Sequence, residues 1–82
     1  MPKLSIDSYS KDAVEFLEWA YGMGSRIAFN YNVAMGQRPG QALMNVLRDH
    51  DEDGYNRLTG SLVDPFYDNS KIPAALDKLT SK

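Results

Sequence analysis

The stretch that decides the fold is RPGQALMNVLRDH, residues 38–50. Its apolar side chains recur at steps of three and four residues, which is the spacing of one face of a helix. The residues on this inward face are Leu43, Val46, Leu47 and His50. Pro39 suits the first turn, because its missing backbone N–H would have no partner there in any case. The stretch therefore predicts an amphipathic helix over about residues 41–50, with its apolar face turned into the core.

An earlier helix is predicted over residues 10–21, with Gly22 and Gly24 ending it. Ser10 suits the N-cap, since its hydroxyl can accept a hydrogen bond from an unpaired backbone N–H. Asp12 would then lie in the first turn, where the helix dipole favours negative charge. The apolar residues at helical spacing are Ala13, Phe16, Leu17, Ala20 and Tyr21.

The segment RIAFNYNVAM, residues 26–35, fits either a strand or a helix. The residues that alternate with smaller or polar neighbours, as in a half-buried strand, are Ile27, Phe29, Tyr31, Val33 and Met35. Ile27, Tyr31 and Ala34 also fit a helical stripe. A strand here would have only very short segments to pair with, at residues 4–6 and 61–63. The helix is therefore the favoured prediction.

Downstream of the central stretch, the pattern predicts one further helical turn and a closing helix. The further turn carries Tyr55 and Leu58 and ends at Gly60. The closing helix is expected to begin near Ser70, with Pro73 in its first turn. Its apolar residues are Ile72, Leu76 and Leu79. Lys78 and Lys82 suit its C-terminal end, where the helix dipole favours positive charge.

The composition fits a single globular domain. The chain has 82 residues, 43% of them hydrophobic, and no cysteine, which excludes disulfides and thiolate zinc sites. We expect a compact, mainly α domain of three to four helices spanning residues 1–82, with residues 1–9 as a flexible arm. The alternative is an α+β domain with one minor pairing of short strands. The N-terminus has no apolar run long enough for a signal peptide or membrane span, so a cytoplasmic location is expected.

The stretch DHDEDGYNRLTG, residues 49–60, resembles a calcium-binding loop at its beginning only. The residues at loop positions one, three, five and six are Asp49, Asp51, Asp53 and Gly54. Position twelve, which should supply a bidentate carboxylate, is Gly60, and position nine is the cationic Arg57. We therefore interpret the stretch as an acidic cap and turn between two helices. Calcium binding through Asp49–Gly60 is the least favoured of the functions considered.

No catalytic motif is recognisable. His50 is the only histidine, and its neighbour Asp49 would point about 100° away from it on a helix. Ser61 has no base in a recognisable arrangement, and GMGS, residues 22–25, has too few glycines for a phosphate-binding loop. We therefore expect no catalytic residues, no metal site and no cofactor.

The surface most suited to binding is a polar stripe on the central helix. Its members, which follow one another at steps of three, four and three residues, are Arg38, Gln41, Asn45 and Arg48. They lie roughly opposite the apolar face. Three interpretations are open: a solvated face, an internal face on which Gln41 and Asn45 bond the loop DPFYDN, residues 64–69, or a protein interface. The interface would also use the aromatic residues Phe66 and Tyr67.

The preferred function is a non-enzymatic protein-interaction module with a protein partner; homo-oligomers are allowed and a membrane partner is not expected. A nucleic-acid-binding accessory protein is the alternative, with phosphates bound by Arg26, Arg38, Arg48 and Arg57 and bases stacked on tyrosines. It is disfavoured by the net charge of −2 and by the acidic block at residues 49–53. The aromatic residues near the stripe are Phe29, Tyr31, Phe66 and Tyr67, and most of them are expected to help fill the core. Met23, Met35 and Met44 are expected in the core as well.

Residues 38–80 resemble a group of small, mostly uncharacterised phage and prophage proteins. The resemblance rests on RPGQALMNVL at 38–47, LTGSLVDPFYDN at 58–69 and IPAAL at 72–76. Members of the group share an Arg-x-Gly-Gln-Ala helix with an asparagine four residues after the glutamine, and a Gly-Thr-x-x-Asp-Pro-Phe-Tyr turn. Ser61 stands here where threonine is more usual. The resemblance implies a phage or prophage source, hence the host cytoplasm, and assigns no reaction.

Overall fold

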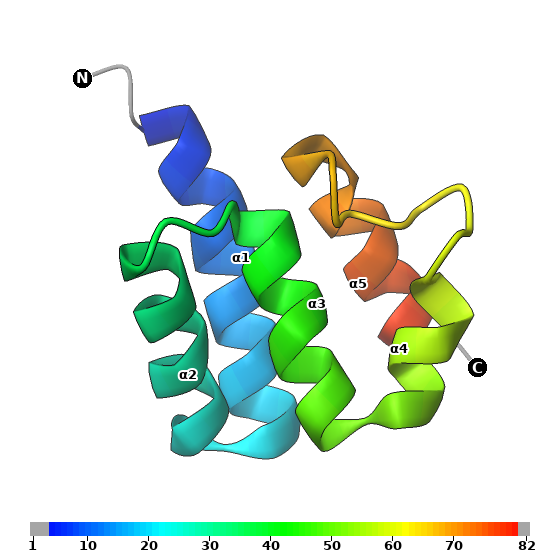
Figure 1. Cartoon of the computed structure of the whole chain (residues 1–82), viewed down its shortest axis with the longest axis horizontal. Helices are drawn as coiled ribbons and strands as arrows, with labels where there is room; N and C mark the ends of the chain where they lie inside the picture. The colour runs from blue at the N-terminus through cyan, green and yellow to red at the C-terminus, as the bar shows by residue number, and fades with distance from the viewer. Residues whose placement is uncertain (1–3, 81–82) are drawn as a thin grey trace.

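The computed structural model describes residues 4–80, which form five α-helices and one short 310-helix (Figure 1). The elements are α1 (Leu4–Tyr21), α2 (Met23–Ala34), α3 (Pro39–His50), α4 (Glu52–Leu58), η1 (Asn69–Lys71) and α5 (Ile72–Thr80). No strand occurs among these residues, so the prediction of a mainly α domain is confirmed and the two-stranded alternative is not found. The helices exceed the expected three to four because the turn around Tyr55 and Leu58 is a separate helix.

Helix α3 lies at the centre, with α2 on one side and α4 and α5 on the other (Figure 1). Its inward face contacts two groups of buried side chains. The first group is Ala13, Leu17, Phe29, Ala42, Leu43, Val46 and Ile72. The second is Met44, Leu47, Leu58 and Ala75. The predicted helix, its proline at the first position and the burial of Leu43, Val46 and Leu47 are thus confirmed.

His50 does not belong to that inward face. It is exposed at the last residue of α3, and its ring stacks on Tyr21 with centroids 5.3 Å apart and an interplanar angle of 16°. The spacing of His50 places it on the side of α3 that carries Leu43 and Leu47. Helix α3 ends at this residue, however, and the buried core does not reach it. His50 therefore covers the half-buried Tyr21 from the solvent side.

Helix α1 begins at Leu4, so the predicted N-cap at Ser10 and the placement of Asp12 in a first turn are wrong. Six residues of the proposed arm, 4–9, belong to this helix, and residues 1–3 lie outside the described part of the chain. The helix extends upstream because the apolar spacing continues there: Tyr9 packs against the same core as Ala13. Ala20, in contrast, is exposed rather than part of the buried face.

The junction of α1 and α2 is a tight turn at Gly22, whose φ of 101° is disfavoured for residues with a side chain. Ser25 follows in the first turn of α2 and is completely buried. Its hydroxyl lies 2.8 Å from the carbonyl oxygen of Leu17 and 2.7 Å from that of Gly22. Within GMGS, residues 22–25, the Ser25 hydroxyl therefore links the start of α2 to α1 by a hydrogen bond. Gly24 does not end a helix, because α2 has already begun at Met23.

Helix α2 confirms the helical prediction for residues 26–35 but not the expected burial of its side chains. Phe29 is buried as expected, whereas Tyr31, Met23 and Met35 are 63%, 55% and 66% exposed. Met44, on α3, is 1% exposed. The periodicity alone did not show which of the two apolar sides of α2 would face a neighbour.

Residues 49–60 form the predicted acidic cap and turn. Asp51 is the N-cap of α4, and its Oδ1 accepts a 3.0 Å hydrogen bond from the backbone N–H of Gly54. Its Oδ2 accepts from the hydroxyl of Tyr21 at 3.1 Å. Helix α4 then covers residues 52–58, and the chain turns at Gly60 with a φ of 76°. The stretch is thus a helix start rather than an open coordinating loop.

The described C-terminal part follows the prediction, with Lys78 in the last turn of α5, whereas the predicted Lys82 lies outside the described residues. Asp68 caps η1, where the side chain and backbone N–H of Ser70 hold the pKa of its carboxyl below the usual value. Helix α5 follows directly, with Pro73 in its first turn. Ile72 is fully buried, and Leu76 and Leu79 are partly buried. None of the helices between residues 4 and 80 has the length and apolar character needed to span a bilayer.

Candidate protein-binding pocket

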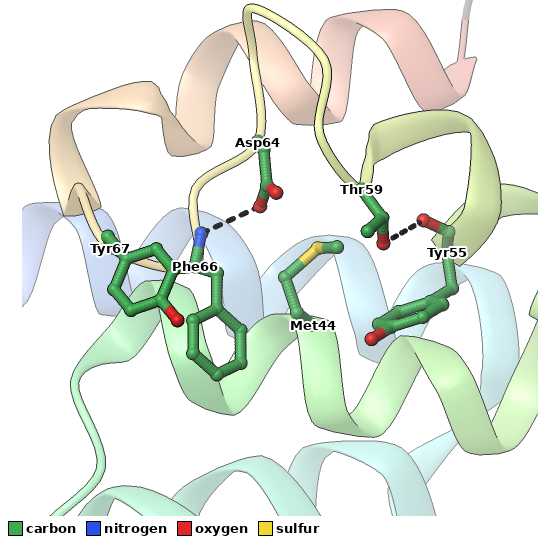
Figure 2. A pocket seen from close by; sticks show the side chains of 6 residues that line it. All are labelled: Met44, Tyr55, Thr59, Asp64, Phe66 and Tyr67. Carbon is green, nitrogen blue, oxygen red and sulfur yellow. Dashed lines mark hydrogen bonds between the residues drawn. The ribbon is translucent and has the colours of Figure 1, made fainter.

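A pocket of about 200 Å³ opens between α3, α4 and the loop that precedes η1 (Figure 2). Its lining residues are Met44, Tyr55, Thr59, Asp64, Phe66 and Tyr67. Four of these six carry a large apolar or aromatic side chain. Other hollows on the surface, including one of about 330 Å³ between α1 and α2 and one of about 410 Å³ on α5, have no aromatic residue in their lining.

Met44 lies between the two aromatic sides of the pocket (Figure 2). It lies on α3, belongs to the second group of buried residues and is only 1% exposed. Phe66 and Tyr67 lie on one side of it, with ring centroids 4.8 Å apart at 65° in an edge-to-face arrangement. Tyr55 lies on the other side. Because the thioether of methionine is flexible and polarisable, it can adapt to an apolar group placed between these rings.

Backbone hydrogen bonds fix the loop that carries Phe66 and Tyr67. Asp64 accepts from the N–H of Phe66 through Oδ1 at 3.0 Å and from the N–H of Gly60 through Oδ2 at 2.8 Å. An aspartate before a proline commonly bonds the backbone two residues on in this way. Pro65 itself is buried. The DPFY sequence therefore makes a rigid turn that presents two adjacent aromatic rings.

Helix α4 supplies the opposite side. Tyr55 is half-buried in the second group of core residues, and Thr59 follows it by one helical turn. The hydroxyl of Thr59 donates a 2.8 Å hydrogen bond to the carbonyl oxygen of Tyr55 (Figure 2). The same carbonyl also accepts a 2.9 Å hydrogen bond from the backbone N–H of Thr59, so two groups of Thr59 close the end of α4. Thr59 is itself exposed, so its side chain stands at the entrance of the pocket.

Two arginines of α3 and its N-cap flank the pocket. The guanidinium of Arg38 lies over the ring of Tyr67, 5.7 Å from its centroid, and donates a 3.3 Å hydrogen bond to the carbonyl oxygen of Phe66. The guanidinium of Arg48 lies over the ring of Tyr55 at 6.0 Å. Both distances are within the range of cation–π attraction. Each arginine is thus held against one of the two tyrosines, and positive charge stands at both ends of the pocket.

The predicted stripe is only partly a single surface. Arg38 and Arg48 are exposed and flank the pocket that Phe66 and Tyr67 line, whereas Gln41 is half-buried. Asn45 donates a 2.9 Å hydrogen bond to the side-chain oxygen of Gln37, so its amide supports the turn before α3.

The loop at residues 64–69 is bonded to α3, as the internal interpretation expected, but through different groups. Arg38 bonds Phe66, and the N–H of Gly40 donates a 2.9 Å hydrogen bond to the side chain of Asn69. Neither Gln41 nor Asn45 makes the bond predicted for it. The guanidinium reaches the loop because Arg38 stands at the N-cap, next to where the loop crosses the helix end.

Sequence reasoning missed four lining residues: Met44, Tyr55, Thr59 and Asp64. The burial of Met44 confirms the prediction of a core residue, and its side chain also lines the pocket. Tyr55 lies seven residues after Arg48, and a helix break separates them, so no helical periodicity links the two. The two cation–π pairs are tertiary contacts without a signal in the sequence.

Comparisons with known proteins assign no relative to this chain. No protein-family model matches the sequence, and no curated protein or solved structure is significantly similar to it. Among residues 4–80, no group of three or more His, Cys, Asp or Glu side chains is arranged to hold a metal ion.

Proposed function

We propose that this protein is a non-enzymatic interaction module whose pocket receives one apolar side chain from a protein partner. The observation that carries the proposal is an aromatic-lined pocket of about 200 Å³ with an arginine fixed at each end. Interfaces commonly place a buried anchor side chain in a well-packed pocket, and polar or charged residues form the solvent-accessible rim around it.

The size of the pocket supports a side chain rather than a cofactor or a metabolite. Small-molecule sites usually enclose about 300–1,000 Å³, whereas a cavity of about 150 Å³ holds a benzene molecule. The volume of about 200 Å³ therefore suits one leucine, phenylalanine or tryptophan side chain. The carboxylate of Asp64 is not free to bind a ligand, because both of its oxygens already accept from backbone N–H groups.

The charge around the pocket supports an acidic partner segment. Arg38 and Arg48 are exposed and have no carboxylate partner among the ion pairs of the described residues. Their guanidinium groups keep free N–H donors while they rest on Tyr67 and Tyr55. Arginine in this setting suits carboxylates, to which it can donate two parallel hydrogen bonds. We therefore expect an apolar anchor with Asp or Glu on both sides of it.

The experiment is a selection of short random peptides on the immobilised protein, followed by fluorescence anisotropy with the enriched peptides. Thr59→Phe would fill the entrance without touching the core and should weaken binding about tenfold or more. Arg38→Glu and Arg48→Glu should each weaken it several-fold, more at low salt than at high salt. Arg57→Glu is the matched control, since this exposed arginine lies outside the pocket lining. Peptides that bind Thr59→Phe as tightly as the unmodified protein would refute the proposal.

A second candidate is single-stranded nucleic acid, and one observation favours it. Tyr67 is 82% exposed beside Arg38, which is the arrangement of an aromatic stacking platform with a nearby phosphate-binding cation. The acidic residues 49–53 directly follow Arg48 and oppose this function. A gel shift at low salt that disappears steeply with added salt would establish it. Absence of any shift at low salt would exclude it.

The biological setting we propose is that of a phage accessory protein acting on a host or phage protein in the host cytoplasm. It rests on the resemblance of residues 38–80 to phage and prophage proteins, and the pocket adds a reason for the motifs that carry it. The motif residues Arg38, Phe66 and Tyr67 all lie at the pocket or flank it. A genomic neighbourhood without phage genes would refute this setting while leaving the pocket proposal intact.

A further inference from the structure

The outer face of α2, continued by its C-cap Met35, carries a stripe of large apolar side chains that are more than half exposed in the described chain. Its members are Met23, Ile27, Tyr31 and Met35, which are 55%, 62%, 63% and 66% exposed. They follow one another at intervals of four residues and so form one continuous row along the helix. We call this row the α2 stripe. Figure 1 shows α2 at the outer edge of the molecule, with α1 and α3 against its other side.

We propose that the α2 stripe is a homodimer interface, at which α2 of one copy packs antiparallel against α2 of a second copy. The stripe is nearly symmetric about its midpoint: a methionine stands at each end, and Ile27 and Tyr31 stand on either side of Phe29. In a two-fold dimer each residue meets the partner residue at the mirrored position. Met23 would therefore meet Met35 of the second copy, and Ile27 would meet Tyr31.

The charges of α2 are compatible with this pairing. Arg26 is the only Asp, Glu, Lys or Arg residue of α2, and it already pairs with Glu18 of α1 at 2.8 Å. The antiparallel register places Asn32 of the second copy opposite Arg26, so no like charges meet. Gly24 and Ala34, which are small and exposed, border the stripe and allow a second helix to approach closely.

The area of the stripe suits a weak dimer. If about 200 Å² is available on each large side chain, exposed fractions of 55–66% leave roughly 500 Å² per subunit, or about 1,000 Å² for two. Specific interfaces begin near 1,200 Å², which the bordering residues of α2 would supply. A patch of roughly 500 Å² is near the upper end of what monomeric proteins expose, and patches of that size often serve in binding. We therefore expect dissociation in the micromolar range.

A membrane surface fits the stripe less well than a second copy. Helices that lie in a membrane interface carry several Lys or Arg residues on their polar face. Helix α2 has a single arginine, which is paired with Glu18. The dimer would also leave the binding pocket free, since α3, α4 and residues 64–67 supply its lining. Helix α4 lies on the other side of α3 from α2 (Figure 1). The inference therefore does not depend on the proposed function.

Sedimentation equilibrium over a concentration range from low micromolar to submillimolar tests the proposal. The unmodified protein should shift from monomer to dimer with rising concentration. Ile27→Lys should weaken the dimer at least about tenfold, because both copies would then carry a lysine charge in the apolar centre of the interface. Ala74→Lys is the control, since it adds the same charge at an exposed position of α5. A monomer at all concentrations, or a dimer that tolerates Ile27→Lys, would overturn the proposal.

The register has its own test. Met23→Glu and Met35→Lys should each weaken the dimer, whereas the double variant should restore it, because each new carboxylate would face an ammonium group of the other copy. Within one chain the two positions are about 18 Å apart, so they cannot pair internally. Circular dichroism should show the same helix content for all variants. A double variant as weak as the single ones would overturn the antiparallel arrangement.

Discussion

The backbone N–H of Gly40 donates a 2.9 Å hydrogen bond to the side-chain oxygen of Asn69, 29 residues further along the chain. The N–H groups in the first turn of a helix have no partner within it, and this bond satisfies one of them from η1. Gly40 is buried because the carbonyl of Pro65 lies where a Cβ would stand. The contact between these two segments holds the aromatic loop against α3.

Gly40→Ala should destabilise the protein by about 2 kcal/mol or more, although alanine normally favours a helix over glycine by about 1 kcal/mol. The reason is the collision of the new methyl group with the Pro65 carbonyl, which is backbone and cannot move aside easily. Urea unfolding followed by circular dichroism measures the change. Gly24→Ala is the matched control at protein concentrations low enough to keep the chain monomeric, since this helical glycine has open space around it within the chain and its substitution should be neutral or stabilising there.

Asn69→Ala should cost about 1 kcal/mol of unfolding free energy, because it leaves the part-buried N–H of Gly40 without its acceptor. Asn69→Asp should be tolerated, since a carboxylate also accepts the bond and is favoured beside the first turn of α3. Urea unfolding of both variants measures the difference. Equal losses in the two variants would show that the amide contributes through something other than this acceptor.

The central helix and the closing helix could be predicted from the sequence because local signals agreed there. Pro39 at the first position and the spacing of Leu43, Val46 and Leu47 all favour the same helix. The start of α1 could not be predicted, since Ser10 offers a good cap signal that the packing of Tyr9 against the core overrides. Local propensity competes with tertiary burial, and burial is the larger free energy.

The binding pocket shows a different limit of sequence reasoning. Arg38, Phe66 and Tyr67 could be predicted as surface candidates because their residue types suit interfaces. That Arg38 would lie on Tyr67, and Arg48 on Tyr55, depends on contacts between segments 7 to 29 residues apart. Contacts between such distant segments cannot be predicted from a single sequence. The exposure of the α2 stripe was missed for the same reason: an apolar helix face predicts a neighbour but does not say whether it belongs to the same chain.

Asp51→Ala should lower the free energy of unfolding by about 1–2 kcal/mol, the usual cost of removing an N-cap. The carboxylate bonds both Gly54 and Tyr21, so its loss affects the start of α4 and the end of α1 together. Asp53→Ala is the control, since Asp53 lies exposed in the first turn of α4 and does not cap it. Thermal unfolding with millimolar calcium and with chelator completes the test, and we expect the same Tm in both. A Tm that rises with calcium would favour the metal-binding interpretation of residues 49–60.

The hydroxyl of Tyr21 should make stability depend on pH above 10. Burial, followed by the charge and hydrogen bond of Asp51, raises the pKa of Tyr21 from 10.0 to about 12. Between these values the unfolded chain releases the proton while the folded one keeps it, so the contribution is complete below pH 10 and is lost as the pH rises to 12. Solvent screening limits the loss to about 1 kcal/mol. Urea unfolding at pH 9 and 11 should show a smaller decrease for Tyr21→Phe than for the unmodified protein, and equal decreases would contradict the raised pKa.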